Sequence, residues 1–457
     1  MKKGVLYINL LLAILFFIAC GIFIYMRGQT VPWPKRIDSV NFKLKVPLLA
    51  PEEISKDNGY YYLRQLKNLN DSDSENLSEE EVSKLEALEE KECDIISELS
   101  KNGYTGKYPA ADPLIEKYKS NIELLYQAGR CKYATGVVFT NFADSINSFE
   151  PSLNSFKIAL YSVSKQLDTN PEKAIEKISL LINSSINLSQ TAFLINYFFS
   201  VAQLGFMEET LKGMVDLKRL TPKQEVEISK MLINAEHRIL PLSEVIKVER
   251  MWSLLAIDEV FNVENSKSVL EVSLIHIPKV LSGAGVLGFS KESTKENFDK
   301  VYSNYIYASE SPVSKETIEI MSELDSFIEN NDRSDLSIMF STDPIGRLLL
   351  TVCVPSLNDV LVLRQQMLAK LRSTATYLAV AAYKQDKGDL PATLSELVPV
   401  YIKSVPLDPH SGDTKELQYK VLNKNEWEIF TVKGIYPYSD QDKYKHFSIS
   451  SIPKETQ

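Results

Sequence analysis

A continuous apolar stretch near the N-terminus is the strongest pattern in the chain. Residues 5–26 contain no charged side chain, and Asn9 is the one clearly polar residue among them. A helix of this length rises about 33 Å, which is enough to cross the hydrocarbon core of a bilayer. The pattern therefore predicts a transmembrane helix between a short tail (1–4) and a juxtamembrane spacer (27–51), in which Trp33 suits the membrane interface.

Two other interpretations of this segment stay open. Ala19-Cys20 is similar to a lipoprotein cleavage box, although the apolar run continues past Cys20, where a lipoprotein normally turns polar. The first residues, MKKGVLYINL, resemble a prepilin leader, in which a glutamate usually follows the glycine by five positions; Asn9 stands there in this chain. Basic residues flank the apolar stretch on both sides, so their count does not decide its orientation.

Residues 52–355 show helical periodicity and predict a helical body. A first short helix is expected over 52–70, and a solvated acidic helix within 71–98. The apolar stripe expected along this acidic helix consists of Val82, Leu85, Leu88, Ile95, Ile96 and Leu99. Asp112 and Asn170, each followed by a proline, are predicted N-caps. The succession of helix pairs predicts an irregular bundle or an α-solenoid, and no clean 34-residue repeat fits it, so a tetratricopeptide array is not predicted.

One stretch of this body, residues 191–206, is apolar around much of its helical circumference. Such a helix is either buried between neighbouring helices or spans a membrane. The polar residues Gln190, Asn196, Ser200 and Gln203 favour burial.

Helix breakers cluster near the C-terminus. A long amphipathic helix is predicted over 357–386, with Gly388 as a left-handed C-terminal cap. Pro391 prevents the helix from continuing, and Thr393 and Glu396 form a capping box for a second, short helix.

The residues beyond these breakers predict a compact unit. Tyr401 is expected to pack back against the long helix, and residues 417–434 alternate as two strands around Asn423-Lys424-Asn425. The helices and this β-hairpin together predict a small α+β unit over 356–450, followed by a tail over 451–457. The fold class is therefore mainly α, with an N-terminal transmembrane helix and a small α+β C-terminal unit.

The segments DKGDLP, LVPVYI, VPLDP and LQYK, within residues 370–434, resemble the C-terminal core of the type II secretion major pseudopilin. The residues that carry this structural motif are Tyr383, Gly388, Pro391, Thr393, Glu396, Leu397, Pro399, Tyr401, Pro406, Asp408, Pro409, Tyr419 and Trp427. The resemblance implies a short helix, a turn and a small antiparallel sheet after the long helix. Members of the family can bind calcium in a late acidic loop. Asp440 and Asp442 lie in a comparable place, and whether they bind calcium stays open.

Composition adds limits on chemistry. The net charge of -9 argues against a nucleic-acid partner, and four widely spaced cysteines form neither a zinc framework nor a disulfide scaffold. A Cys93–Cys131 bridge and two free thiols are both compatible with the spacing. The GxGxxG at 283–288 lacks a surrounding βαβ pattern and is interpreted as a connector. The four histidines have no metal-ligand spacing, and we predict no catalytic, cofactor or metal site.

These observations predict a single-pass protein of the bacterial inner membrane with its soluble body outside the cytoplasm. The expected partners are the lipid bilayer, through residues 5–26, and other proteins. The expected role is non-catalytic: structural or protein-interacting, and linked by the resemblance to secretion or pilus-like assembly. One alternative is a module that binds a peptide or glycan, which a deep pocket lined by aromatic and a few polar groups would favour. Another is an enzyme with an unrecognised site, which close carboxylates or a perturbed histidine would favour.

Overall fold

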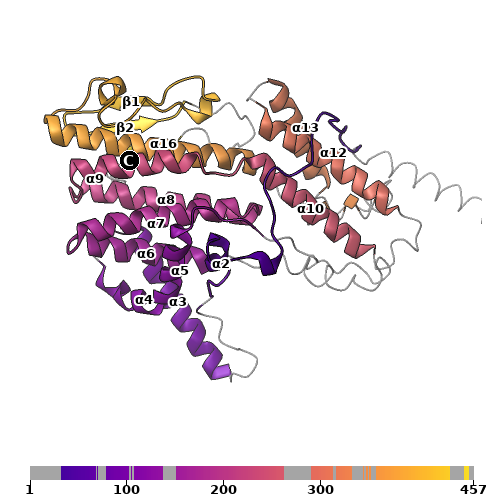
Figure 1. Cartoon of the computed structure of the whole chain (residues 1–457), viewed down its shortest axis with the longest axis horizontal. Helices are drawn as coiled ribbons and strands as arrows, with labels where there is room; N and C mark the ends of the chain where they lie inside the picture. Colours follow the sequence, from indigo (N-terminus) through magenta and orange to yellow (C-terminus); the bar gives the residue numbers. More distant parts are fainter. Residues whose placement is uncertain are drawn as a thin grey trace, which may run out of the picture. The chain divides into compact units, whose positions relative to one another are not determined.

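The computed structural model describes residues 32–67, 69, 79–101, 104, 108–136, 151–261, 290–311, 315–331, 343, 346–347, 349–350, 357–432 and 447–451. This part of the chain is mainly helical, with one three-stranded antiparallel sheet near the C-terminus, which confirms the coarse fold prediction (Figure 1). The expected transmembrane helix at 5–26 lies outside the described residues. Within them, none of the helices combines the length and the apolar character needed to cross a membrane.

The chain divides into two compact units. The first comprises residues 1–44, 139–146 and 246–358, and the second comprises 45–138, 147–245 and 359–457. The described helices of the first unit are α12 (Lys291–Glu310), α13 (Lys315–Asn331) and most of α10 (Leu242–Val260).

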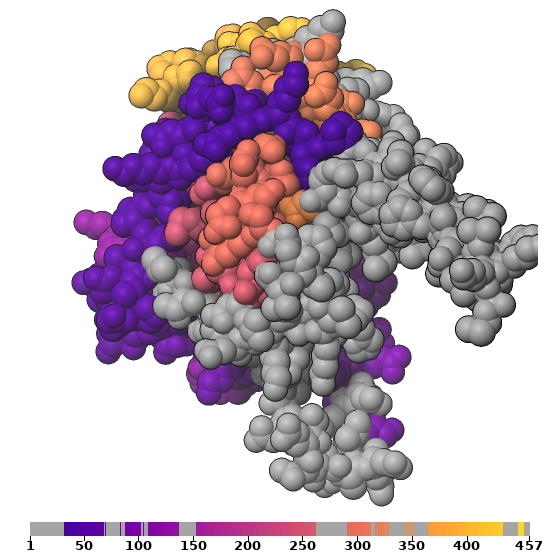
Figure 2. All heavy atoms as spheres, turned by 90° about the vertical axis from the view of Figure 1, so that its right-hand side faces the viewer, coloured from indigo at the N-terminus to yellow at the C-terminus, as the bar shows by residue number. Residues whose placement is uncertain are grey.

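The predicted juxtamembrane spacer is fastened to the first unit. Ile37 N donates to Ser303 Oγ (3.0 Å), and Asn304 Nδ2 donates to the carbonyl oxygen of Lys35 (2.8 Å). The Trp33 ring lies against Phe327, with a centroid separation of 5.2 Å, and its expected place at a membrane interface stays a prediction. Figure 2 shows this segment, in indigo, beside the orange surface of the helices. These contacts hold residues 33–37 of the spacer against α12 and α13.

The second unit contains nine described helices and the sheet. They are α2 (Gly59–Leu63), α3 (Glu79–Lys101), α4 (Asp112–Lys117), α5 (Lys119–Arg130), α6 (Pro151–Leu167), α7 (Pro171–Gln190), α8 (Leu194–Asp216), α9 (Pro222–Glu236) and α16 (Leu357–Lys387). Short 3₁₀ turns add η1 (Pro51–Glu53), η3 (Pro109–Ala111), η7 (Leu394–Leu397) and η8 (Pro409–Ser411).

Two predicted helix starts have different outcomes. Asn170 caps α7 as expected, because its side chain accepts from Lys173 N at 3.1 Å. Asp112 is the first residue of α4 rather than its N-cap. Its carboxylate instead accepts from Tyr161 Oη and Lys165 Nζ, both at 2.7 Å, so distant partners replace the local cap.

The first helix of the body is shorter than predicted. Among the described residues of 52–70, the structure has the end of η1 and the five-residue α2 as its helical elements. Asn58 starts α2, and its side-chain oxygen accepts from both Tyr60 N and Thr135 N at 3.0 Å. This tie to a distant segment sets the helix start at a position that the local pattern does not indicate.

The acidic helix α3 packs through one end. Ile96 and Leu99 are buried, as the predicted stripe requires, whereas Leu88 is 63% exposed and that part of the prediction is wrong. Glu92 is buried as well. Tyr118 Oη and Lys117 Nζ donate hydrogen bonds to its carboxylate, which offset the cost of burying this charge. The side chains of Val82 and Leu85 lie outside the described ones, and among those described the stripe is buried toward the C-terminal end of α3.

Much of the helix α8 is buried between neighbours, as predicted for 191–206, although Ile195 is 52% exposed. Several of its polar groups are hydrogen-bonded there: Ser200 Oγ donates to the carbonyl oxygen of Ser185 (2.7 Å), and Ser185 Oγ donates to Gln203 (2.8 Å). Asn196 donates to Thr191 Oγ1 at 2.8 Å. Hydrogen bonding between α7 and α8 explains how these polar groups can be buried at low cost.

The C-terminal elements follow the breaker pattern. α16 ends before Gly388, which has φ +84°. Strands β1 (Gln418–Val421) and β2 (Trp427–Phe430) form the predicted hairpin. A third strand, β3 (Ser448–Ser450), pairs antiparallel with β2, giving the order β1-β2-β3. The predicted short helix is the single 3₁₀ turn η7.

Candidate functional site

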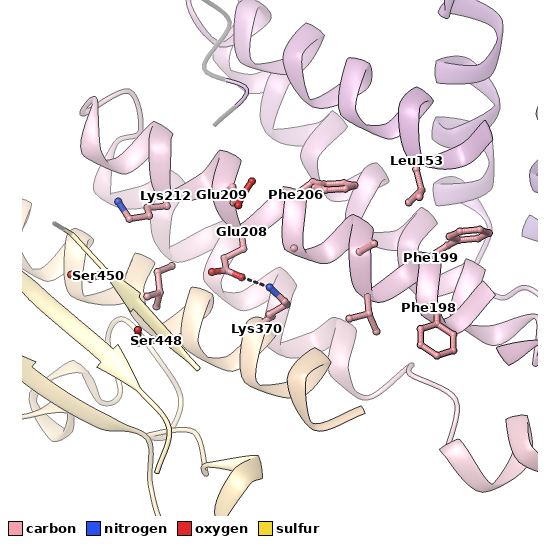
Figure 3. Close-up of a pocket in the computed structure, with 14 residues that line it drawn as sticks. Leu153, Phe198, Phe199, Phe206, Glu208, Glu209, Lys212, Lys370, Ser448 and Ser450 are labelled. Atoms are coloured by element: carbon pink, nitrogen blue, oxygen red, sulfur yellow. Dashed lines mark hydrogen bonds and ion pairs between the residues drawn. The ribbon is translucent and has the colours of Figure 1, made fainter. Parts of the chain in front are cut away.

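An open groove lined largely by apolar side chains lies in the second unit, between α8, α16 and β3 (Figure 3). Its volume is about 650 Å³. We call it the aromatic groove. It is lined by Leu153, Phe198, Phe199, Val201, Ala202, Gly205, Phe206, Glu208, Glu209, Lys212, Lys370, Ser448, Ile449 and Ser450.

The wall formed by α8 follows from its spacing. Phe198, Ala202, Gly205 and Lys212 recur at helical intervals, so they share one face, and each is half-buried. The opposite side of α8 is packed against α6 and α7. A helix that is apolar on nearly all sides can therefore fill the core and still present aromatic rings to a groove.

Phe206 is held in place by its neighbours. Its ring lies 6.1 Å from that of Tyr104, and Lys157 Nζ lies 4.7 Å from its centroid. Burial raises the pKa of Tyr104 to about 12 and lowers the pKa of Lys157. The phenol of Tyr104 therefore stays neutral at physiological pH. Phe206 is positioned by packing against the Tyr104 ring and by a cation–π contact with Lys157.

The polar groups of the aromatic groove are paired. Lys370 Nζ donates to Glu208 at 3.0 Å and also lies 5.2 Å from the ring centroid of Phe447. Lys212 pairs with Asp216 at 2.5 Å. Gly205 leaves room for the Lys370 head, because a Cβ there would meet Nζ at 3.3 Å. The groove thus offers apolar surface with charged groups already satisfied at its edge.

The residues of the predicted motif lie together around the end of α16. Tyr383 Oη donates to Glu396 (2.9 Å), and Tyr401 Oη donates to Asp386 (3.1 Å), with the two rings 5.5 Å apart. Glu396 also accepts from Thr393 N, as a capping box requires. These contacts place Tyr401 back on α16, as predicted.

The remaining motif residues connect this region to the sheet. Tyr419 Oη donates to the carbonyl oxygen of Pro391 (3.0 Å), Leu397 is fully buried, and Trp427 stacks on Tyr377 with a centroid distance of 5.1 Å. The Pro406 carbonyl oxygen accepts from Leu417 N at 3.0 Å.

Asp408 and Pro409 form a buried turn that is tied to the end of β2. Asp408 accepts from His410 N (2.8 Å) and Val432 N (2.6 Å), and His410 Nδ1 lies 2.9 Å from Thr431 Oγ1. The contact between His410 and Thr431 joins an imidazole to a hydroxyl group, and both side chains are buried. In the described residues, the contacts of the motif connect the end of α16, η7 and η8 with the sheet. Three of its members, Pro399, Tyr401 and Pro406, also line a second groove.

The remaining candidate positions are the cysteines, the late acidic residues and the glycines of 283–288. Cys93 and Cys131 are free thiols. Asp440, Asp442 and the glycines of 283–288 lie outside the described residues. Among the described side chains, no three His, Cys, Asp or Glu residues come close enough together to hold a metal ion.

The chain was compared with protein-family models, with curated proteins and with solved structures, and no match was found in any of the three. The aromatic groove itself was missed by the sequence analysis. Its signal in the sequence is a cluster of aromatic residues in 191–206 that is followed, on the same helix, by the charged residues Glu208 and Lys212. A helix that is buried on every side would not carry charged residues beside its aromatic ones.

Proposed function

We propose that this chain is a non-catalytic, single-pass protein of the bacterial inner membrane that binds a peptide segment of a partner protein outside the cytoplasm. The observation that carries the proposal is the aromatic groove, which combines three phenylalanines with a few charged groups in about 650 Å³. Pockets that bind ligands are typically lined by apolar and aromatic side chains with a small number of polar groups.

A peptide fits the aromatic groove better than a glycan does. Sugar hydroxyls need unpaired donors and acceptors, whereas Lys370 and Lys212 already have carboxylate partners. An apolar peptide side chain needs only the surface of Phe198, Phe199 and Phe206. The resemblance of residues 370–434 to a pseudopilin core supports a partner in secretion or pilus-like assembly, and the apolar composition of 5–26 supports the anchor.

Site-specific photocrosslinking in bacterial cells tests the binding role. A photoreactive phenylalanine analogue replaces Phe198 in the groove. As a control it replaces Ile195, which is 52% exposed on the same helix but does not line the groove. We expect one discrete protein adduct from position 198 and none from 195. The adduct should disappear in an Ala202→Phe background, which fills the groove. Adducts that form equally from both positions, or that survive the filling, would overturn the proposal.

The membrane part of the proposal has its own test. A C-terminal tag is exposed to protease in cells with a permeabilised outer barrier, and the mass of the mature N-terminus is read from the same sample. Digestion of the tag together with an intact N-terminus supports a plain anchor. Cleavage after Gly4 would instead indicate a pilin-like subunit, and cleavage before Cys20 a lipoprotein. Protection of the tag while a periplasmic control is cut would place the body in the cytoplasm.

A further inference from the structure

A second groove in the second unit combines basic rims with an apolar floor. It has a volume of about 630 Å³ and lies between one face of α9 and the segment 399–407. Lys230, Ile233 and His237 recur along α9 at helical spacing, and Lys403 and Leu407 come from the opposite segment. We call it the basic groove. It shares no lining residue with the aromatic groove.

The basic groups on the rims are free to bind. In the part of the chain that the structure describes, Lys230 and Lys403 are exposed and neither makes a hydrogen bond or an ion pair. His237, at the end of α9, is also exposed. The whole chain carries a net charge of -9, so a groove with two unpaired lysines has a local charge of opposite sign to that of the chain. Such a local field attracts and orients negatively charged ligands.

Arg372 lies under the groove and has a different role. Its guanidinium donates to both oxygens of Glu236 (3.0 and 2.6 Å), to the carbonyl oxygen of Leu407 (2.7 Å) and to Asp413. Burial disfavours the charged form, but the hydrogen bonds to Glu236 and Asp413 outweigh it, and the pKa of Arg372 is raised above its ordinary value. Arg372 therefore fixes the two walls and is not available to a ligand.

The wall opposite α9 is held by hydrogen bonds to other elements. Tyr401 is tied to Asp386, the Pro406 carbonyl oxygen accepts from Leu417 N, and the Leu407 carbonyl oxygen accepts from Arg372. The Leu407 side chain stays 42% exposed at the edge of the groove. Binding to a surface that is already ordered avoids most of the entropy cost of arranging it.

The dimensions fit a short extended peptide. From Lys230 to His237 the helix rises about 10 Å, which an extended chain covers in about three residues. Successive side chains of an extended chain point to opposite sides. An apolar residue that faces Ile233 and Leu407 therefore turns its two neighbours away from the floor, and acidic side chains at these two positions would lie beside the rims that carry Lys230 and Lys403. We propose that the basic groove binds an extended acidic peptide segment of a partner protein, with an apolar residue between its acidic ones.

A peptide selection with charge inversion tests this assignment. The full chain in zwitterionic lipid nanodiscs is screened against a phage-displayed random peptide library, in parallel with Lys230→Glu/Lys403→Glu. We expect the natural chain to enrich peptides in which Asp or Glu flank an apolar residue. The double variant should lose this enrichment and select Lys and Arg instead. A synthetic peptide of the enriched sequence should bind the variant at least tenfold more weakly.

Matched variants separate the groove from general charge effects. Lys223→Glu/Lys424→Glu makes the same charge change at exposed positions outside the groove and should select the same peptides as the natural chain. Lys230→Arg/Lys403→Arg should keep the binding. Ala202→Phe, which fills the aromatic groove, should leave it unchanged, so failure of the proposed function and failure of this inference are distinguishable.

Three outcomes would overturn the assignment. The first is the absence of acidic peptides among those enriched, and the second is equal enrichment by the natural chain and the Lys230→Glu/Lys403→Glu variant. The third is capture of phosphatidylglycerol vesicles, dependent on Lys230 and Lys403, without any peptide enrichment, which would identify a lipid surface as the ligand. Because both lysines are exposed and unpaired, the variants should unfold at the same temperature as the natural chain, and a change there would show that the loss of binding is structural.

Discussion

Glu225, in the first turn of α9, is a fully buried carboxyl group with few compensating contacts. Gln385 Nε2 donates to Oε1 at 2.8 Å, while Oε2 has no partner among the described residues. Burial raises the pKa of Glu225 to about 8; the hydrogen bond from Gln385 lowers it, and the charge of Asp386 raises it. At neutral pH this side chain is therefore largely protonated.

The raised pKa makes the stability of the second unit depend on pH. The ordinary pKa of the group is 4.5, so between this value and about 8 the folded state binds a proton that the unfolded state has lost. The free energy of unfolding falls as pH rises through this range, because stability falls where the folded state holds more protons. Below pH 4.5 the contribution is fully present, and above about 8 it is lost.

Substitution of Glu225 by glutamine should remove this dependence. Glutamine has nearly the same shape and carries no charge, so Glu225→Gln should flatten the curve between pH 5 and 8 and be more stable than the natural chain at pH 9, by about 2 kcal/mol. Thermal unfolding of the full chain in micelles, followed at several pH values, measures this. Glu227→Gln, at an exposed position on the same helix, should leave the curve unchanged. Parallel curves for Glu225→Gln and the natural chain would contradict the argument.

At the scale of elements, the sequence predicts those features that depend on residues close together in the chain. The Asn170 cap, the Gly388 cap and the β1–β2 hairpin each depend on residues a few positions apart, and all three are present in the structure. The start of α2 and the role of Asp112 depend on partners such as Thr135 and Lys165, which no local pattern identifies. The same reason explains why β3 was not predicted, since its pairing with β2 joins separated segments.

The contact between α5 and α7 rests on one glycine. A Cβ added at Gly129 would lie 2.0 Å from the carbonyl oxygen of Leu180, a backbone atom that cannot move alone. Gly129→Ala should therefore push the helices apart and destabilise the chain by about 3 kcal/mol. Gly205→Ala is the matched control, because its Cβ would meet only the flexible end of Lys370 at 3.3 Å.

Denaturant unfolding of both variants compares these two environments. Gly205→Ala should be neutral, or more stable by up to about 1 kcal/mol, since alanine favours the helix more than glycine does. We thus predict that the same substitution lowers the free energy of unfolding at position 129 and leaves it unchanged or raises it at position 205. Equal effects at both positions would mean that helix propensity, and not the close approach of α5 to α7, sets the stability there.

At the scale of the molecule, the two grooves show what the sequence could not predict. The aromatic groove joins residues of α6, α8, α16 and β3, and the basic groove joins α9, α16 and the segment 399–407. The motif at 383–427 was predicted as a structural unit and contributes Pro399, Tyr401 and Pro406 to one wall of the basic groove. The facing residues on α9 had no local feature that marked them, because exposed lysines on a helix are common.

The attachment of the spacer leads to a prediction about the anchored protein. Between Met26, the end of the proposed membrane helix, and Trp33, the chain can extend about 25 Å at most. Trp33 is held against Phe327, and the Lys35 carbonyl oxygen accepts from Asn304. If residues 5–26 cross the bilayer, the first unit must lie close to the membrane surface.

Energy transfer to the lipid surface can measure this distance. A donor dye is placed on α12 at the exposed position of Glu296→Cys, in a chain whose natural cysteines are replaced by serine, and acceptor dyes are carried by lipid headgroups in nanodiscs. We expect strong transfer, which should fall when twenty Gly and Ser residues are inserted between Arg27 and Gly28, because such a linker adds about 25 Å of reach. The same insertion after Gln457 should leave the transfer unchanged. Weak transfer in the parent chain, or transfer that the insertion before Gly28 does not reduce, would show that residues 27–31 do not act as a short tether between a membrane helix and the first unit.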